Sequence, residues 1–292
     1  MQNYSIFNLI KNAFSGHKNW DLAWKDPTPK KEYDVVIIGG GGHGLATAYY
    51  LAKEHNITNV AIIEKGWIGG GNVGRNTTII RSNYMHDDNA LFSEFGMDLW
   101  RKMSQDLNYN VMFSPRGIIN LAHSDAQMNV YARRGNSMRL NGIDAVLLNR
   151  EQVKEIIPMA DFSENVRFPI FGGLMQPSAG TARHDAVAWG YARQADSMGV
   201  DIIQNCEVTG FDIAGGKING VRTSRGDIKV KKIGLCVAGS TNILAEKLNM
   251  TLPIETHLLQ ACVSEPVKPI LDRVVTFGAG HFYISQSDKG EM

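Results

Sequence analysis

The sequence predicts an α/β fold that begins with the βαβ unit of a doubly wound sheet, and three observations carry this prediction. Residues 33–38 (YDVVII) form a short β-branched run that is typical of a buried parallel strand. A glycine-rich loop follows at once, and residues 45–55 then have the composition of a helix. Residues 59–64 (NVAIIE) form a second apolar strand, which completes the unit.

An arm is predicted ahead of the first strand, in residues 1–32. Four apolar side chains recur there near helical spacing, which favours a short amphipathic helix: Ile6, Leu9, Ile10 and Phe14. Trp20 and Trp24 follow and lead into the breaker run DPTPKK. Because exposed tryptophans are costly to leave in water, we expect the arm to pack either on its own domain or on a partner chain.

The rest of the chain mixes helices and strands after a second glycine-rich loop at residues 66–76. Helices are predicted at residues 90–104, 125–141, 151–157 and 185–198. Strands are predicted at residues 168–173 (with a turn), 201–203, 207–208 and 232–239. The alternating stretch 211–232, with turns at its glycines, is typical of a β-meander.

The composition excludes several classes of protein. The chain has 292 residues, enough for one large domain or two ordinary ones. Its composition, with 43% hydrophobic and 20% charged residues, excludes a disordered chain. A net charge of +1 gives no electrostatic reason to expect nucleic acid binding. Glycine is the outlier, because 30 glycines are present and they are clustered.

Cysteine and hydropathy patterns set the expected compartment. Cys206, Cys236 and Cys262 are widely spaced and form no CxxC pair, so we expect no disulfide framework and no metal site. The N-terminus lacks the unbroken apolar core of a secretory signal. The most apolar stretch, residues 35–52, is interrupted by four glycines and a histidine and is a poor membrane span. We interpret the protein as cytoplasmic, without a membrane partner.

The first glycine loop, GGGGHG, fits the pattern GxGxxG through Gly39, Gly41 and Gly44. The first glycine permits a tight turn, the second permits a pyrophosphate to approach the positive end of the helix, and the third permits close packing of helix on strand. Glu64 lies about 20 residues beyond Gly44, where a carboxylate can accept hydrogen bonds from ribose hydroxyls. A carboxylate at this position disfavours NADP, because it would repel the 2′-phosphate, whereas FAD and NAD both fit. The alternative to a dinucleotide site is a glycine turn in an unrelated α/β protein.

The second glycine loop, GGGNVGRNTT, follows the acid that ends the second strand. Glycines and small polar side chains can run along an extended cofactor, and Asn72 and Thr77 are then the expected contacts. The alternative is a mobile surface loop.

Three segments resemble a known family: YDVVIIGGGGHGLATAYYLA, IIEKGWIGGGNVGRNTTIIRSNY and GTARHDAVAWGYAR. They resemble the β subunits of heterotetrameric sarcosine oxidases, within the wider family of FAD-dependent amine oxidoreductases that includes glycine oxidase and D-amino acid oxidase. The resemblance runs from the arm to the last residue, and the wider family shares only the first two segments. Members continue well past the position of Met292, with a further glycine-rich segment and a lysine near the flavin. We therefore expect a chain truncated at its C-terminus.

The resemblance implies a Rossmann-like FAD-binding domain of α/β class, interleaved with an α+β substrate domain built on a mixed sheet. After the arm at residues 1–32, we place the FAD-binding domain at residues 33–84 and 175–250. The substrate domain, which is incomplete, then occupies residues 85–174 and 251–292.

The resemblance also implies two flavins. A noncovalent FAD is expected at the glycine loops, in contact with Gly42, His43, Glu64, Asn72, Thr77, Ile79 and Val208. An FMN is expected on His184, where a neutral imidazole nitrogen would attack the 8α carbon of the flavin. From the residues alone, His184 is a solvated residue ahead of a helix that Asp185 caps. Its neighbour Arg183 either pairs with the FMN phosphate or holds the imidazole neutral.

Arg81 is the expected substrate ligand. In monomeric sarcosine oxidases, which TIIR at residues 78–81 resembles, the arginine after two isoleucines binds the substrate carboxylate. A planar guanidinium pairs with a carboxylate through two parallel hydrogen bonds. The alternative is that Arg81 is an ordinary surface arginine. Arg116 is a weaker candidate for the substrate ligand. We interpret His123 and His257 as structural histidines.

The implied activity is oxidative demethylation of sarcosine to glycine at FAD. Electrons then pass to FMN and to O₂, which gives hydrogen peroxide, and the one-carbon unit goes to tetrahydrofolate or leaves as formaldehyde. The implied partners are α, γ and δ subunits. Two alternatives stay open: an FAD-only glycine or D-amino acid oxidoreductase, and a noncatalytic flavin-binding or assembly subunit.

Overall fold

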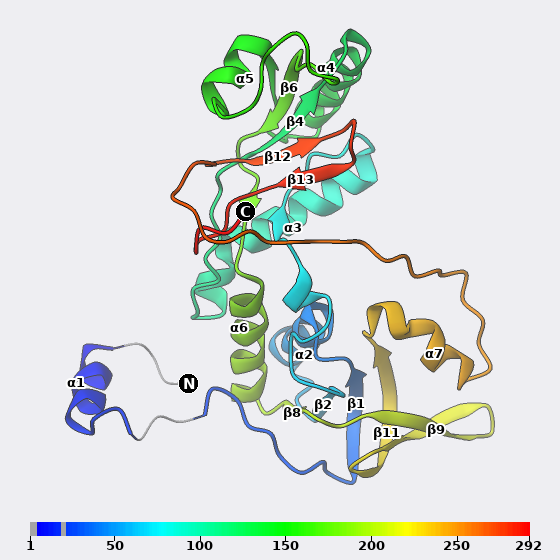
Figure 1. Ribbon diagram of the computed structural model, residues 1–292. Helices are drawn as coiled ribbons and strands as arrows, with labels where there is room; N and C mark the ends of the chain where they lie inside the picture. The colour runs from blue at the N-terminus through cyan, green and yellow to red at the C-terminus, as the bar shows by residue number, and fades with distance from the viewer. Residues whose placement is uncertain (1–4, 19–21) are drawn as a thin grey trace. The chain divides into compact units, whose positions relative to one another are not determined.

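The computed structural model describes residues 5–18 and 22–292, so Trp20 of the arm lies outside the described residues. The chain divides into two compact units (Figure 1). Unit 1 comprises Met1–Asn76, Gln105–Asn110 and His184–Leu259. Unit 2 comprises Thr77–Ser104, Val111–Arg183 and Gln260–Met292.

Unit 1 is built on a six-stranded sheet in the order β8-β2-β1-β11-β10-β9. The strands are β1 (Glu32–Ile38), β2 (Val60–Ile63), β8 (Asp201–Ile203), β9 (Val208–Ala214), β10 (Lys217–Thr223) and β11 (Gly226–Leu235). The first four in spatial order are parallel, and β10 and β9 continue the sheet as an antiparallel meander. The predicted βαβ unit is confirmed, since α2 (Gly42–His55) connects β1 to β2. The central strand β2 and residues 35–38 of β1 are apolar without interruption, because both faces of the sheet are covered there.

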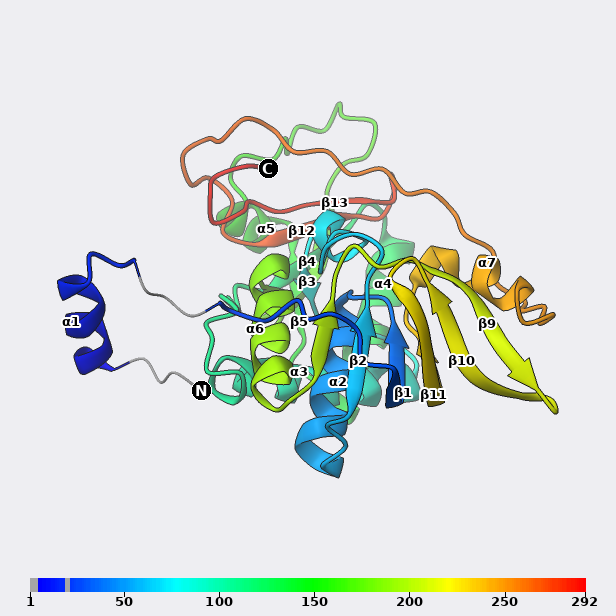
Figure 2. The same ribbon diagram turned by 90° about the horizontal axis from the view of Figure 1, so that it is seen from below.

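Helices α2 and α6 (His184–Ser197) pack beside one another on the strands of unit 1 (Figure 2). Their contact uses small residues and rings, and the ring centroids of Tyr49 and Tyr191 lie 5.4 Å apart in an edge-to-face arrangement. One buried cluster of the sheet includes Tyr33, Val36 and Ile63, all almost fully buried. Short elements complete the unit: η1 (Val73–Arg75), η2 (Ala238–Ser240) and α7 (Thr241–Glu246).

The arm forms the predicted amphipathic helix, α1 (Ile6–Phe14), which Ser5 caps by accepting a hydrogen bond from the N–H of Asn8. No residue of α1 is buried. The stretch that follows is attached to unit 1, because the N–H of Lys25 donates to Asp196 and Lys30 forms an ion pair of 2.7 Å with Asp201.

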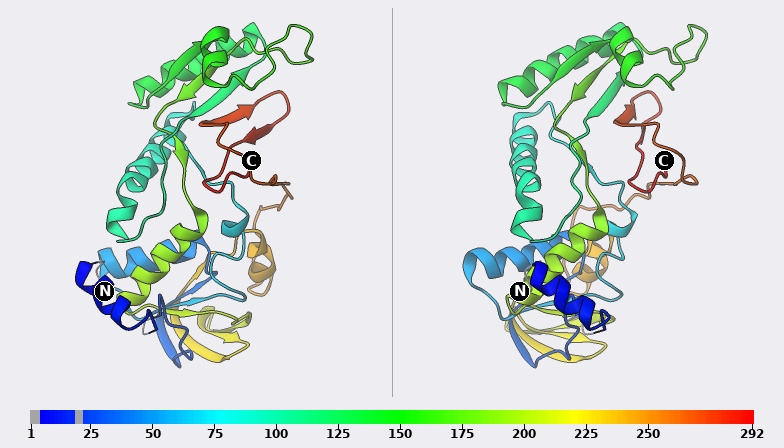
Figure 3. Two further views of the ribbon diagram at one scale, coloured as in Figure 1. Left: turned by 60° about the vertical axis from the view of Figure 1, so that its left-hand side comes forward. Right: turned by 90° about the vertical axis from the view of Figure 1, so that its left-hand side faces the viewer.

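Unit 2 contains a mixed five-stranded sheet in the order β13-β12-β4-β6-β5. The strands are β4 (Ile118–Ala122), β5 (Val146–Asn149), β6 (Gly172–Gln176), β12 (Val274–Phe277) and β13 (Phe282–Ile284). In this sheet β12 and β4 pair in parallel, and the other neighbouring strands pair antiparallel. Figure 3 shows the red β12–β13 pair beside the green strands. The helices are α3 (Asp87–Asp106), α4 (Asp125–Leu140) and α5 (Arg150–Ile156). A separate two-stranded antiparallel ribbon is formed by β3 (Ile79–Ile80) and β7 (Gly180–Thr181).

Several segments lie elsewhere than the sequence predicts. Residues 77–84 and 175–183 belong to unit 2, because β3 pairs with β7 there. Residues 251–259 belong to unit 1, where the main-chain oxygen of Ile254 accepts a hydrogen bond from Asn242. The strand predicted at 168–173 starts later, at Gly172, and the strand predicted at 232–239 ends earlier, because β11 stops at Leu235. Among the described residues, no helix is long and apolar enough to cross a membrane.

Candidate functional site

Two positions of the first glycine loop in unit 1 require glycine, one for its backbone conformation and one because a Cβ has no room there. Gly39 follows β1 at φ +109°, and a Cβ there would lie 2.3 Å from the main-chain oxygen of Cys236. A Cβ at Gly44 would lie 1.9 Å from the oxygen of Gly39. The tight turn and the close approach of helix to strand, both expected of the first and third glycines, therefore exist in this chain.

The middle of the loop is open where a phosphate group would lie. Gly41 is the N-cap of α2, Gly42 is its first residue, and among the described residues no side chain caps this end. A Cβ at Gly41 or Gly42 would meet only Val73, at 3.9 and 3.5 Å. His43 is exposed in the first turn of the helix. Free N–H groups at a helix start bind phosphate oxygens, so this loop fits a dinucleotide pyrophosphate.

Glu64 lies at the end of β2 with both carboxylate oxygens fixed. Its Oε2 accepts a hydrogen bond of 2.8 Å from the N–H of Gly40, and its Oε1 accepts one of 2.8 Å from the N–H of Gly66. Each carboxylate oxygen can accept two hydrogen bonds, so one direction on each remains for ribose hydroxyls. The side chain is therefore held in place and keeps the acceptor capacity that the sequence predicts.

The second glycine loop is held by its own hydrogen bonds and by the first loop. The N–H of Gly69 donates to the oxygen of Gly40 at 3.0 Å, and Arg75 Nη1 donates to the oxygens of Gly70 and Gly71 at 2.7 and 3.0 Å. Asn72 is exposed at the start of η1. The loop thus has a defined shape beside the first loop.

Two further candidates of unit 1 lie on different elements. His184 is the first residue of α6 and is partly buried; the helix starts one residue earlier than predicted, which places Asp185 in its first turn. One turn further along α6, Ala188 lies 3.5 Å from the Cβ position of Gly69 in the second loop. The side chain of Val208 belongs to the core of the sheet, so a cofactor contact at this residue must come from its main chain.

Three candidates belong to unit 2. The hydroxyl of Thr77 lies 2.6 Å from that of Tyr283 on β13. Ile79, on β3, packs against a buried cluster around Ile118. Arg81 follows β3; its Nη1 donates a hydrogen bond of 2.6 Å to Asn83 Oδ1, and its guanidinium stacks 4.6 Å from the ring centroid of Tyr84.

The charge of Arg81 is uncompensated, since no carboxylate pairs with it anywhere in residues 5–18 and 22–292. An arginine in this state, with one N–H engaged and the others available, is suited to bind a carboxylate. This arrangement favours the substrate role over that of an ordinary surface arginine.

The weaker candidates have other partners. Arg183 forms an ion pair of 3.0 Å with Asp288, and Arg116 donates to the main-chain oxygen of Gln286. His123 packs edge-to-face against Phe277 with ring centroids 4.4 Å apart, in keeping with a structural role. His257 is exposed, 3.7 Å from a carboxylate oxygen of Glu255.

Sequence reasoning missed several polar residues around Arg81. Asn83 and Ser82 are fully buried, and Asn120 and Thr276 lie within the apolar strands β4 and β12. A polar residue inside an apolar run such as IINLA is the one sequence signal that could have identified them.

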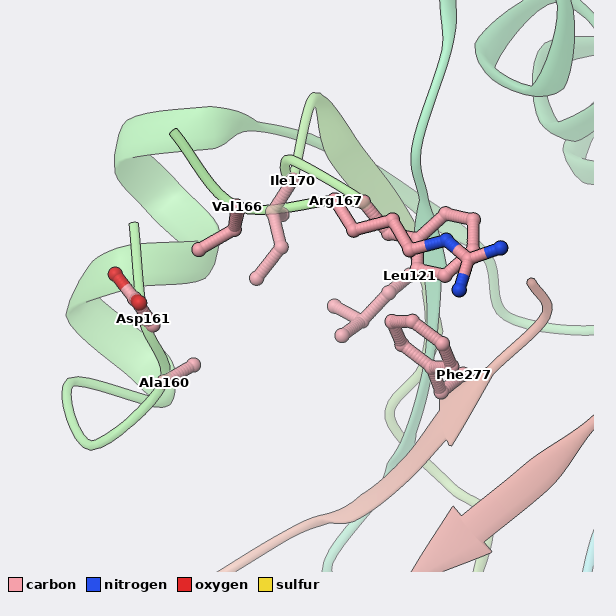
Figure 4. Close-up of a pocket in the computed structure, with 8 residues that line it drawn as sticks. Leu121, Ala160, Asp161, Val166, Arg167, Ile170 and Phe277 are labelled. Atoms are coloured by element: carbon pink, nitrogen blue, oxygen red, sulfur yellow. The ribbon is translucent and has the colours of Figure 1, made fainter. Parts of the chain in front are cut away.

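A hollow of about 330 Å³ lies elsewhere in unit 2 and contains none of the candidate residues. Figure 4 shows Leu121 and Phe277 at its wall, with Asp161 and Arg167 on opposite sides. We assign it no role in the candidate site.

The fold and the two glycine loops define the class of protein. The family model described as "DAO: FAD dependent oxidoreductase" matches residues 34–292, and the chain belongs to this family. The fold agrees: L-proline dehydrogenase from P. horikoshii superposes with a TM-score of 0.80 at 27% identity, over 90% of this chain and 69% of that one. Glycine oxidase from Geobacillus kaustophilus, at 19% identity and a TM-score of 0.75, shares the fold. The predicted fold class is thereby confirmed.

Within this family, the chain belongs with the sarcosine oxidase β subunits. It is 61% identical to "Sarcosine oxidase subunit beta" of Rhizobium meliloti (strain 1021) over 99% of this chain and 69% of that protein. It is 52% identical to the protein of the same name from Rhodobacter capsulatus, over 100% of this chain and 70% of that protein. The chain spans about 70% of the length of these relatives. The resemblance drawn from the three sequence segments is confirmed.

Proposed function

We propose that this FAD-dependent oxidoreductase oxidises sarcosine, N-methylglycine, to glycine at a noncovalent FAD. One observation carries the proposal: identity of 61% to a sarcosine oxidase β subunit over almost the entire chain. The uncompensated guanidinium of Arg81 supplies a ligand for the single carboxylate that sarcosine carries.

The residues of unit 1 fit the adenosine diphosphate portion of FAD. Gly39, Gly41, Gly42, His43 and Gly44 form the loop and helix start that would hold the pyrophosphate. Glu64 would accept hydrogen bonds from the ribose hydroxyls. The proposal also includes, as contacts of FAD, Asn72, the main chain of Val208, Thr77 and Ile79.

Bound FAD would supply the acceptor for a hydride and its two electrons. The chain's own contribution is to bind and orient the amine. Arg81 would hold the carboxylate, and the site must favour the neutral amine, because only a nitrogen lone pair can assist departure of hydride from the N-methyl carbon. Water then adds to the resulting C=N bond, which releases glycine and formaldehyde.

The proposal extends to a second flavin and to partner subunits. We infer an FMN attached to His184, supported by the segment TARHD and by the position of His184 at the start of α6. Electrons would then pass to this FMN and to O₂, giving hydrogen peroxide, and the one-carbon unit would go to tetrahydrofolate or leave as formaldehyde. The relatives are named as subunits, which supports assembly with α, γ and δ chains. The three free cysteines support a cytoplasmic location.

Anaerobic addition of sarcosine to the flavin-loaded protein, assembled with its partner chains, tests the proposed activity. We expect the FAD absorbance near 450 nm to bleach (on the order of one equivalent of FAD per chain). We also expect Arg81→Ala to raise KM for sarcosine at least about tenfold, with FAD content unchanged. Bleaching by glycine or a D-amino acid but not by sarcosine would favour the FAD-only alternative. No bleaching with any amine would favour a noncatalytic subunit.

A further inference from the structure

A chain of hydrogen bonds starts at Arg81 and crosses unit 2. Arg81 Nη1 donates to Asn83 Oδ1 at 2.6 Å, Asn83 Nδ2 donates to Asn120 Oδ1 at 2.8 Å, and Asn120 Nδ2 contacts Thr276 Oγ1 at 2.5 Å. Asn120 on β4 and Thr276 on β12 are direct partners in the parallel register of these strands. We call the four residues Arg81, Asn83, Asn120 and Thr276 the Asn83 relay.

The direction of the relay is set by its first member. A guanidinium has donors and no acceptor, so Asn83 must turn its amide oxygen toward Arg81. Its amide nitrogen then points at Asn120, which must present an oxygen in return and turn its own nitrogen toward Thr276. Arg81 therefore orients two amides, and those amides in turn hold one N–H of Arg81 in a fixed place.

The backbone beneath Arg81 is also fixed. Asn83 is fully buried, and its main-chain oxygen accepts hydrogen bonds from Nε and Nη2 of Arg134 on α4. The preceding residue, Ser82, is fully buried as well; its N–H donates to Gln176 at 3.0 Å and its hydroxyl donates to Glu94 at 2.6 Å. Arg81 thus extends from a segment that is anchored on two sides.

Positive charge accumulates at this point without a counter-charge. Over the described residues, neither Arg81 nor Arg134 pairs with a carboxylate, and Glu94 is engaged by Arg101 and by Ser82. Burial, with the nearby charge of Arg81, lowers the pKa of Arg134. Asn83 touches both arginines and is neutral, so it contributes hydrogen bonds without cancelling their charge.

We propose that Asn83 is a positioning residue that holds the Arg81 guanidinium through a neutral hydrogen bond, so that its charge and its remaining N–H groups stay available to the substrate carboxylate. The inference rests on the proposed carboxylate role of Arg81 and deepens it. It names the residue that sets both the orientation and the effective charge of this ligand.

Replacing Asn83 with aspartate tests the proposal with little change of shape. A carboxylate at this position would pair with Arg81 and compete with the substrate. The relay can adapt, because Asn120 can turn its nitrogen toward Asp and the Thr276 hydroxyl can donate to the Asn120 oxygen. We expect the Kd of acetate, measured by calorimetry on the FAD-loaded protein, to rise at least about tenfold. KM for sarcosine should rise in parallel, with a smaller change in kcat and no loss of FAD.

The matched control is Asn136→Asp on α4. Asn136 is exposed and accepts a hydrogen bond of 2.9 Å from Arg139, so the substitution also places a carboxylate beside an arginine. We expect acetate affinity within about twofold of the parent protein in this variant. An equal loss of affinity in both variants would show a general effect of added negative charge and would overturn the role of Asn83.

Two further variants separate the possible outcomes. If Arg81→Ala binds acetate as the parent does, the carboxylate role and the Asn83 inference both fail. If Arg81→Ala loses acetate binding while a folded Asn83→Asp retains it, only the Asn83 inference is overturned.

If thermal melting shows that Asn83→Asp does not fold, Thr276→Val decides, since it removes the far end of the relay. We expect a loss of about threefold or more in acetate affinity there, and unchanged affinity would contradict the proposal.

Discussion

Glu64 joins the two glycine loops of unit 1, since its carboxylate accepts a hydrogen bond of 2.8 Å from Gly40 and another of 2.8 Å from Gly66. A side chain held on both oxygens cannot rotate away from the loop edge. The same two bonds that shape the loops therefore fix the acceptor that we propose for the ribose.

Glu64→Gln should weaken FAD binding. The amide has the size of the carboxylate, but its nitrogen would face an N–H group, so one of the two hydrogen bonds is lost and the charge is removed. We expect the Kd for FAD, from quenching of flavin fluorescence, to rise about tenfold, which corresponds to about 1.4 kcal/mol. Glu207→Gln, at an exposed position, is the control. A Kd within about twofold of the parent would refute the assignment.

Gly44→Ala should destabilise unit 1 far more than a typical glycine replacement in a helix. The added Cβ would lie 1.9 Å from the main-chain oxygen of Gly39, so α2 and β1 would have to separate. Gly96→Ala in α3 is the matched control, because a Cβ there meets nothing within 4 Å. We expect the free energy of unfolding in urea to fall by about 3 kcal/mol for Gly44→Ala. It should rise by about 0.5–1 kcal/mol for Gly96→Ala. Equal effects would show that the close approach is absent.

Local signals were sufficient to predict the first part of unit 1. Residues 35–38 of β1 and all of β2 are continuous apolar runs because both faces of a parallel sheet are covered there, and the glycines after β1 mark the turn into α2. The same logic located α3, α4 and α5, whose apolar residues recur with helical period.

The sheet of unit 2 was predicted only in outline, since its strands are short and pair across long stretches of chain. Asn120 and Thr276 are partners in the β4–β12 register, yet they lie 156 residues apart. No local pattern encodes such a pairing. The candidate site divides in the same way: Gly39, Gly44 and Glu64 follow a motif, whereas the contact of Arg81 with Asn83 becomes visible only once the backbone places them.

His184→Ala should remove covalent flavin and leave FAD in place. The substitution deletes the imidazole at the start of α6, and His184 is not one of the residues that we propose for FAD. We expect the acid-precipitated protein to be colourless, whereas the parent pellet stays yellow and fluoresces. The supernatant should contain the same amount of FAD in both. His86→Ala, at an exposed position, serves as the control. A yellow pellet from His184→Ala would assign the attachment to another residue.

Tyr33 links the base of β1 to the start of β8 through its buried hydroxyl. The side chain is 0% exposed; its hydroxyl donates to Asp201 Oδ2 at 2.8 Å and accepts a hydrogen bond of 2.9 Å from the N–H of Lys30. Burial, together with the hydrogen bond to Asp201, raises the pKa of the Tyr33 phenol well above its ordinary value. The folded state therefore keeps this proton to higher pH than the unfolded state does.

The sign of the resulting pH dependence follows from this difference. A group whose pKa is higher in the folded state contributes stability that is fully present below the unfolded pKa of about 10 and is lost as pH rises above it. We expect Tyr33→Phe to lower the free energy of unfolding at neutral pH by about 1–2 kcal/mol, because Asp201 and Lys30 lose a hydrogen-bond partner. Between about pH 9.5 and pH 11, the parent should lose stability more steeply than the variant. Only the parent has a phenol at this position, and in this range the phenol ionises in the unfolded state but not in the folded state. Urea unfolding across this range measures both quantities, and parallel pH curves would show that Tyr33 ionises as readily in the folded chain as in the unfolded one.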